Sequence, residues 1–146
     1  EKTFGADSPV KQDVFVTNSG TAPASMRAAV SIYWEDAAGN QLWDAPQEGQ
    51  DYSITWGDAL TASTGERWIK GVDGYYYWSV PVGARGKTSN LIDSVEQRGD
   101  HGDKHLVVDI ATQALQANLS AGEGFDAVWS ASSGLKVGAD GALVRK

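Results

Sequence analysis

Trp68-Ile69-Lys70-Gly71-Val72-Asp73-Gly74-Tyr75-Tyr76-Tyr77-Trp78 is the stretch of sequence that decides the fold. Aromatic and β-branched residues are typical of strands. An Asp-Gly pair between two such runs is the strongest short-range signal of a β-hairpin. The stretch therefore predicts two antiparallel strands that are joined by Val72-Asp73-Gly74.

The aromatic side chains of this stretch are also the candidate contact face of the protein. Because successive residues of a strand point to opposite faces, Tyr75 and Tyr77 share one side. Tyr76 and Trp78 share the other side, and one of the two pairs is expected in the core. The second pair either packs against neighbouring strands or is exposed. If exposed, it forms with Trp68 a face on which a sugar ring can stack.

Alternation of apolar and polar residues predicts further strands on both sides of the hairpin. Met26, Ala28, Val30, Ile32 and Trp34 recur at every second position, which marks the core face of one long strand. The strands expected from such patterns are Val10–Thr17, Ala24–Trp34, Gln41–Trp43, Tyr52–Trp56, Leu106–Ile110, Leu135–Val137 and Ala142–Val144. Turn residues separate them, among them Asn18-Ser19-Gly20-Thr21 and the loop from Asp36 to Asn40.

Three segments allow more than one interpretation. Thr88–Val95 fits a strand or a short helix, and Ala111–Ala117 contains helix formers that follow a strand pattern. Val128–Ser130 fits a short strand or a segment that covers the core. Short strands between frequent turns, with 17 glycines, predict an all-β chain: an antiparallel β-sandwich, jelly-roll or immunoglobulin-like, with at most one or two short helices.

Bulk composition limits the class of protein. A chain of 146 residues with 41% hydrophobic residues fits a single folded domain over residues 1–146, in which Glu1–Pro9 is expected to be a mobile N-terminal segment. The 19 acidic and 12 basic residues give a net charge of -7, which disfavours nucleic acid and anionic lipid as partners. No apolar run is long enough to insert into a membrane. The absence of cysteine excludes disulfides and thiol chemistry.

Charged loops supply the candidate metal ligands. His101 and His105 are the only histidines, but the glycine-interrupted segment around them favours a solvated loop over a preorganised metal site. Asp36, Asp44 and Asp58 are hard oxygen ligands of the kind that Ca²⁺ prefers, yet they do not follow a calcium-loop pattern. Each is equally explained as a turn residue. We therefore expect no metal ion and no cofactor.

Other short motifs give no catalytic residue. No Gly-x-Ser-x-Gly elbow is present, so the sequence offers no nucleophile of that class. Arg98-Gly99-Asp100 is a tripeptide that integrin-type receptors read on exposed loops, but chance matches of three residues are frequent. These observations predict a protein that is not an enzyme.

Three stretches together resemble the alternate-signal-peptidase-dependent exported proteins, the biofilm-matrix and camelysin-like family. Val16-Thr17-Asn18-Ser19-Gly20, followed by Arg27, resembles the opening motif of that family. Asp73-Gly74-Tyr75-Tyr76-Tyr77 resembles its hairpin motif. Leu106-Val107-Val108-Asp109-Ile110, leading to Gln116-Ala117, resembles its last core segment. The resemblance covers about residues 10–117, whereas Gly122–Lys146 matches nothing in the family pattern.

The resemblance implies a secreted, non-catalytic structural or adhesive domain of a Gram-positive-type cell surface or biofilm matrix. The partners it implies are other copies of the chain or other matrix proteins. In fibre-forming relatives an N-terminal segment of one subunit adds as a strand to the next, and here Phe4 would anchor such a segment. The alternative from the residues themselves is a module that binds carbohydrate or a host ligand through an exposed aromatic face.

Overall fold

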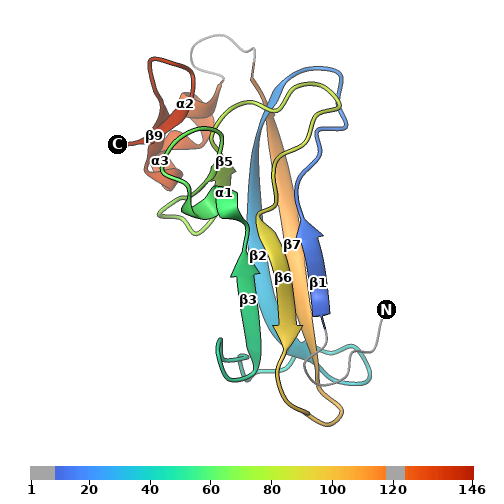
Figure 1. Ribbon diagram of the computed structural model, residues 1–146. Coiled ribbons are helices and arrows are strands. Elements are labelled where there is room, and N and C mark those ends of the chain that lie inside the picture. Colours follow the sequence, from blue (N-terminus) through green and yellow to red (C-terminus); the bar gives the residue numbers. More distant parts are fainter. Residues whose placement is uncertain (1–8, 118–123) are drawn as a thin grey trace. The chain divides into compact units, whose positions relative to one another are not determined.

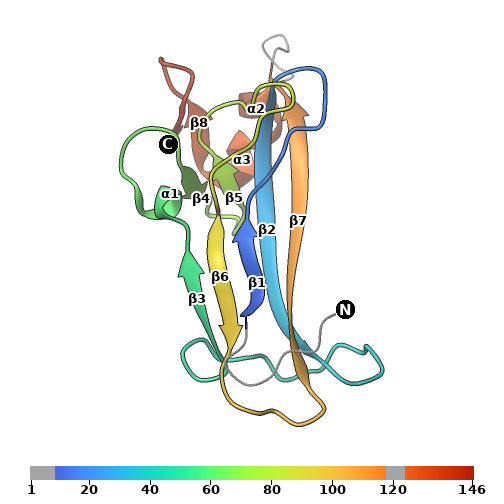
Figure 2. The same ribbon diagram turned by 45° about the vertical axis from the view of Figure 1, so that its right-hand side comes forward.

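The computed structural model describes residues 9–117 and 124–146, whose helices and strands are labelled in Figures 1 and 2. The chain divides into two compact units. The first unit draws on residues 9–14, 30–56 and 92–110. The second draws on residues 15–29, 57–91 and 111–146. The expectation of a single domain stays a prediction. Of the segment Glu1–Pro9 that was expected to be mobile, residues 1–8, with Phe4, lie outside the described residues, and Pro9 begins a strand.

A three-stranded antiparallel sheet forms the first unit together with parts of two longer strands. Its order is β1-β6-β3, with β1 at Pro9–Val14, β6 at Ile92–Gln97 and β3 at Tyr52–Trp56. The segment Thr88–Val95 was open to two interpretations, and its second half, from Ile92 onward, belongs to strand β6. Strand β6 has a partner on each side, and its Ile92 and Val95 are completely buried.

A four-stranded sheet has the order β4-β5-β2-β7, and its two long strands contribute residues to both units. The long strands are β2 at Ala24–Glu35 and β7 at His105–Gln116. Met26, Ala28 and Trp34 are buried, which confirms the predicted core face of β2. The segment Ala111–Ala117 was open to two interpretations, and β7 continues through it as a strand up to Gln116. Sheet pairing here overrides helix propensity.

The central hairpin confirms the prediction from the deciding stretch. Strand β4 (Trp68–Lys70) pairs with β5 (Tyr76–Trp78) in antiparallel register, Ile69 opposite Tyr77. Gly74 has a φ of +87°, a backbone conformation that favours glycine. The Asp73 carboxylate accepts a hydrogen bond from the Tyr75 amide at 3.1 Å and so closes the turn. Turn chemistry thus fixes the register of the aromatic residues.

The number of short helices differs from the number expected from the sequence. The described residues contain three short helices rather than one or two: α1 at Asp58–Thr61, α2 at Phe125–Val128 and α3 at Ser130–Ser133. Val128–Ser130 is therefore not a strand, and its Trp129 packs into the core as a covering segment would. Phe125 and Trp129 lie four residues apart and are both buried, which is the spacing of one helix face. Gly134 then ends α3 with a φ of +73°.

The return strand expected at Gln41–Trp43 does not form. Only a single bridge, between Glu35 and Gln41, is present there. The Asp36 carboxylate accepts hydrogen bonds from the Ala38 and Asn40 amides, each at 2.9 Å, and closes the loop as expected. Pairing ends after Leu42. Trp43 is fully exposed, with a relative exposure of 102%, so it has no core contact that would hold a strand.

The C-terminal residues form the terminal hairpin that the sequence predicts. Strand β8 (Leu135–Val137) pairs with β9 (Leu143–Arg145), and both belong to the second unit. Leu135 and Leu143 are buried with Phe125 and Trp129 in one hydrophobic cluster. None of the helices in the described part of the chain is long and apolar enough to cross a bilayer.

Candidate functional site

Arg27 lies at the centre of the most elaborate side-chain cluster of the second unit. Its guanidinium carbon lies 4.0 Å from the centre of the Tyr75 ring and 4.5 Å from that of Trp129. The guanidinium also donates hydrogen bonds to the Gln113 amide oxygen at 2.6 Å and to the Tyr77 hydroxyl at 3.1 Å. We call these five residues the Arg27 cluster. One arginine thereby joins β2, β5, β7 and the residue between α2 and α3.

Aromatic packing extends the Arg27 cluster into the core. Tyr77 meets Phe125 and Trp129 edge to face, with ring centres 5.6 and 5.9 Å apart. Edge-to-face pairs add about 0.5–1.5 kcal/mol each beyond their buried area, and a desolvated cation over a ring adds up to about 2 kcal/mol. The cluster therefore acts as a structural anchor that holds the helical segment on the sheet.

The Tyr77 hydroxyl is the polar group at the base of this anchor. It donates a hydrogen bond to the Asp73 carboxylate at 2.6 Å and accepts one from Arg27. Burial, with a smaller contribution from the carboxylate of Asp73, raises the pKa of the Tyr77 hydroxyl above its ordinary value, although Arg27 opposes the shift. Tyr77 thus stays protonated, and Asp73 connects the anchor to the turn of the hairpin.

The other side of the central hairpin is also covered. Trp68 and Trp78 pack edge to face with ring centres 5.3 Å apart, and the Trp68 indole donates a hydrogen bond to the Ser89 carbonyl oxygen at 3.1 Å. Trp68, Tyr76, Tyr77 and Trp78 are all buried, and Tyr75 is half-buried under Arg27. Tyr76 and Trp78 are thus the pair in the core, and the second pair packs against neighbouring residues, with Tyr77 buried and Tyr75 half-buried. The five residues therefore do not form the exposed aromatic face that stacking on a sugar requires.

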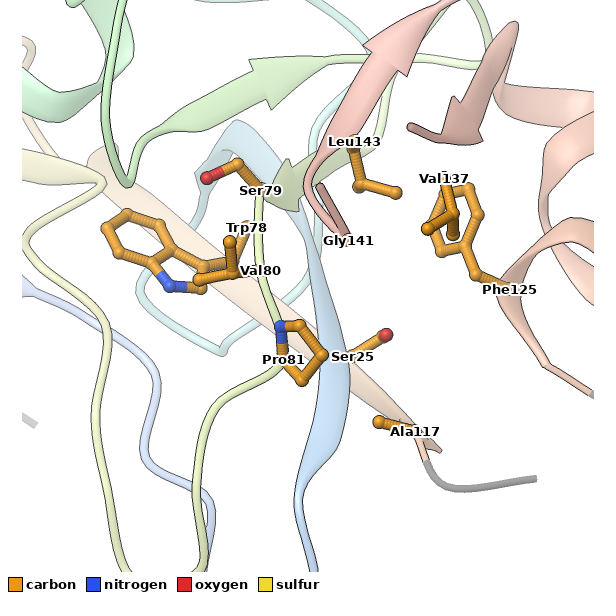
Figure 3. A pocket seen from close by; sticks show the side chains of 10 residues that line it. All are labelled: Ser25, Trp78, Ser79, Val80, Pro81, Ala117, Phe125, Val137, Gly141 and Leu143. Carbon is orange, nitrogen blue, oxygen red and sulfur yellow. The ribbon is translucent and has the colours of Figure 1, made fainter. Parts of the chain in front are cut away.

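A shallow pocket of about 230 Å³ lies near the same hairpin (Figure 3). Apolar side chains from β5, α2, β8 and β9 form most of its wall, and Ser25 and Ser79 are its polar side chains. The Ser79 hydroxyl already accepts a hydrogen bond from the Arg67 amide at 2.9 Å. The lining residues are Ser25, Trp78, Ser79, Val80, Pro81, Ala117, Phe125, Val137, Gly141 and Leu143. Such a wall has room for a small apolar group but offers no acid, base or nucleophile pair.

The two histidines of the first unit face different carboxylates. His101 lies 3.7 Å from an Asp51 carboxylate oxygen, while its ring stacks at a tilt on Trp34 with centres 4.5 Å apart. His105 lies 3.8 Å from a Glu35 carboxylate oxygen. Within residues 9–117 and 124–146, no group of three or more His, Cys, Asp or Glu side chains is arranged to hold a metal ion.

The aspartates considered for calcium have separate local partners. Asp36 binds its own loop backbone, which holds the pKa of its carboxyl below the ordinary value. Asp44 forms an ion pair with Lys104 at 2.8 Å, and the hydrogen bond from Lys104 lowers its pKa as well. Asp58 lies in the first turn of α1, in the second unit. These positions fit the turn and capping roles that Asp often has.

Arg98-Gly99-Asp100 lies in the loop between β6 and β7, and all three residues are exposed. The loop has its own internal bonds. The Arg98 amide donates to the Asp51 carbonyl oxygen at 2.7 Å, and the Asp100 carboxylate accepts from the Gly102 amide at 2.9 Å. The expected charged loop is therefore confirmed, and the Asp100 carboxylate has a structural role within it.

The sequence identified Tyr75 and Tyr77 of the anchor but missed Trp129 and the organising residue, Arg27. Arg27 was singled out only through the resemblance, because a lone arginine in an alternating strand carries no signal of its own. Its partners lie up to 102 positions away in the chain, at Trp129. Comparison of the chain with models of known families, with curated proteins and with solved structures finds no match.

Proposed function

We propose that the chain is a non-catalytic structural domain of a bacterial surface or biofilm matrix, exported from the cell, and that it assembles through the outer edge of β7. The observation that carries this proposal is the free edge at Ala111–Gln116. In the described sheet, β7 is the last strand, with β2 as its one neighbour. Ala111–Ala114 and Gln116 are exposed, and Leu115 is half-buried. An exposed strand edge offers unpaired amides and carbonyls to an incoming strand.

The other edges of the three-stranded and four-stranded sheets carry the features by which proteins block such pairing. Strand β1 has a proline, a charged Lys11 and a bulge, and its Asp13 has a φ of +51°. Strand β3 is partly covered by its own loop, since the Gly49 amide donates to the Tyr52 carbonyl oxygen at 2.7 Å. Strand β4 has only three residues and ends with Lys70. The edge at Ala111–Gln116 has none of these features.

The chemistry of this edge suits a second copy of the same strand. Residues 110–117 contain no charged side chain and no proline, in a chain with a net charge of -7. Two such edges can meet antiparallel around a two-fold axis without like-charge repulsion. The Ala117 amide points inward, because it donates to the Pro23 carbonyl oxygen at 3.0 Å. By strand alternation the amides of Gln116, Ala114 and Thr112 point outward, toward the second copy.

The finer architecture and the location of the protein are part of the proposal. The resemblance of residues 10–117 to the exported matrix family supports a jelly-roll sandwich outside the cell. The antiparallel sheets are consistent with that architecture, and a free edge suits a protein that builds a matrix. The alternative, a carbohydrate-binding face, loses its main support because the five aromatic residues are covered.

The test is a substitution that removes one outward amide. In the full chain, Ala114→Pro deletes a donor at the centre of the edge, where proline is tolerated because no bond to β2 is lost. The matched control is Ala114→Val, which keeps the amide. By sedimentation velocity, we expect self-association in wild type and control, and an association about tenfold weaker in Ala114→Pro. Equal association of the two variants, or a wild-type monomer at millimolar concentration, would exclude this contact.

A further inference from the structure

A cleft with a positively charged rim lies at β4 and β9 in the second unit. It has a volume of about 310 Å³, and its lining includes Arg67, Lys70 and Arg145 but no acidic residue. The Arg67 guanidinium donates to the Gly65 carbonyl oxygen at 3.2 Å, and that of Arg145 donates to the Lys70 carbonyl oxygen at 3.1 Å. Because carbonyl oxygens are neutral acceptors, these bonds orient the cations without neutralising them. The cleft is thus a site of positive charge in an acidic protein.

Part of the cleft wall is apolar. Leu60 and Ala62 from α1 and its C-terminal cap contribute to it, with Ile69 from β4. Lys70 and Arg145 are exposed at the rim, and Arg67 is half-buried. A cleft of this composition suits a ligand that presents a flat apolar group beside carboxylates.

The first unit presents that combination in the loop after β2. Residues 35–51 contain five acidic side chains, at positions 35, 36, 44, 48 and 51, and neither lysine nor arginine. Trp43 in this loop is fully exposed. Glu48 is also exposed, five positions further along the chain, whereas the Asp44 carboxylate is already paired with Lys104. An exposed tryptophan between carboxylates is the kind of side chain that becomes the centre of an interface.

We infer that the cleft at Arg67, Lys70 and Arg145 receives the Trp43 loop of a second copy of this chain. The carboxylate of Glu48 then meets the cations of the rim, and the indole lies on the apolar wall or on a guanidinium. Complementary charge supports a second copy as the occupant, since the most acidic loop and the cationic cleft belong to the same protein. Exposed ion pairs contribute little, so Trp43 supplies most of the affinity.

This inference rests on the proposed self-association, and it adds a second contact that can extend the assembly beyond a dimer. Pairing of two β7 edges is isologous and closes after two copies, whereas a loop in a cleft joins two different surfaces. A contact between different surfaces leaves one loop and one cleft free at each end of the assembly. The loop–cleft contact therefore extends β7-paired dimers into open chains, which is what a matrix requires.

The test uses two variants that are defective at opposite surfaces. The loop variant carries Trp43→Ala and Glu48→Lys, and the cleft variant carries Lys70→Glu and Arg145→Glu. All are made in the full chain with Ala114→Pro, so that β7 pairing does not contribute. The parent chain is expected to form open chains that shorten as salt is raised. Each variant alone is expected to stay monomeric, because its remaining surface has no partner.

Mixing the two variants gives the decisive outcome. The intact loop of the cleft variant fits the intact cleft of the loop variant, so a 1:1 dimer that grows no further is expected in sedimentation equilibrium. A control with Lys11→Glu and Lys87→Glu, which changes the charge elsewhere by the same amount, should still form chains. If the mixture stays monomeric, or if the control loses association as the cleft variant does, the loop–cleft contact is excluded. Association through β7 is tested separately by comparing Ala114→Pro with Ala114→Val in chains that carry Lys70→Glu and Arg145→Glu, where the loop–cleft contact does not contribute.

Discussion

Arg27 shows how one residue makes a group of aromatic side chains into a defined anchor. Its guanidinium lies between the rings of Tyr75 and Trp129 and bonds to Gln113 and Tyr77. A lysine at this position would keep the charge but lose the planar, five-donor geometry that reaches two acceptors while stacking on two rings. The residue type is therefore explained by the surroundings, although the sequence around Arg27 gave no sign of them.

The first prediction at the residue scale concerns Tyr77 and high pH. Because the folded state raises the pKa of this hydroxyl, the unfolded chain loses its proton first as pH rises. The stabilisation is complete below the unfolded pKa of roughly 10 and is lost as pH rises through the folded value. In urea unfolding from pH 8 to 11, we expect the unfolding free energy of Tyr77→Phe to fall less steeply than that of wild type.

Two other tyrosines limit the size of that difference. Burial raises the pKa of Tyr33 and of Tyr52, with added repulsion from neighbouring carboxylates. Part of the alkaline loss of stability therefore remains in Tyr77→Phe. Identical slopes for the two proteins above pH 9 would show that the Tyr77 hydroxyl does not differ between the folded and unfolded states.

Among the elements, α2 and α3 show why very short helices are hard to predict from a sequence. Long alternating strands such as β2 and the Asp-Gly hairpin were predictable, because their pattern repeats over many residues. Four-residue helices such as Phe125–Val128 show barely one period of 3.6 residues, so their pattern does not differ from that of a strand. The cationic cleft was hidden for another reason: Arg145 lies 75 residues from Lys70, and only the fold brings them together.

The prediction at the scale of elements is that Trp129 holds this helical segment in place. Trp129 is buried against Tyr77 and Phe125, with its ring under Arg27. Removing such a ring leaves a cavity, so Trp129→Ala should lower the unfolding free energy by about 3–5 kcal/mol. The neighbouring Val128 is 52% exposed, and Val128→Ala should change the unfolding free energy by less than about 0.5 kcal/mol. Urea denaturation of both variants tests this, and similar losses would contradict a specific anchor.

For the whole molecule, the question is which part of the chain builds the assembly. The resemblance implies that the segment before β1, with Phe4, is donated to a neighbouring subunit, whereas the proposed contacts lie in residues that the structure describes. A single Phe contributes only about 1.5–3 kcal/mol on full burial. A donated segment with one large anchor would therefore need support from other contacts along a fibre.

A truncation separates the two routes. We expect the chain without residues 1–8 to self-associate as the full chain does, because β7, the Trp43 loop and the cleft are all retained. Light scattering and electron microscopy at matched high concentration, at acidic and at neutral pH, measure the outcome. Loss of assembly in the truncated chain, with its fold intact by circular dichroism, would assign the building contact to the N-terminal segment instead.

The interleaving of the two units also affects how the chain reaches its fold. Strand β1 pairs with β6, so Val14 has no strand partner until Ile92 has been synthesised, 78 positions later. At ribosomal speeds that delay is on the order of ten seconds. During this time the uncharged segment of β7, residues 110–116, has not yet been made, and the early strands lack their neighbours. Nascent chains therefore stay open until most of the sequence has emerged, and neither unit can be produced by cutting the gene at a single point.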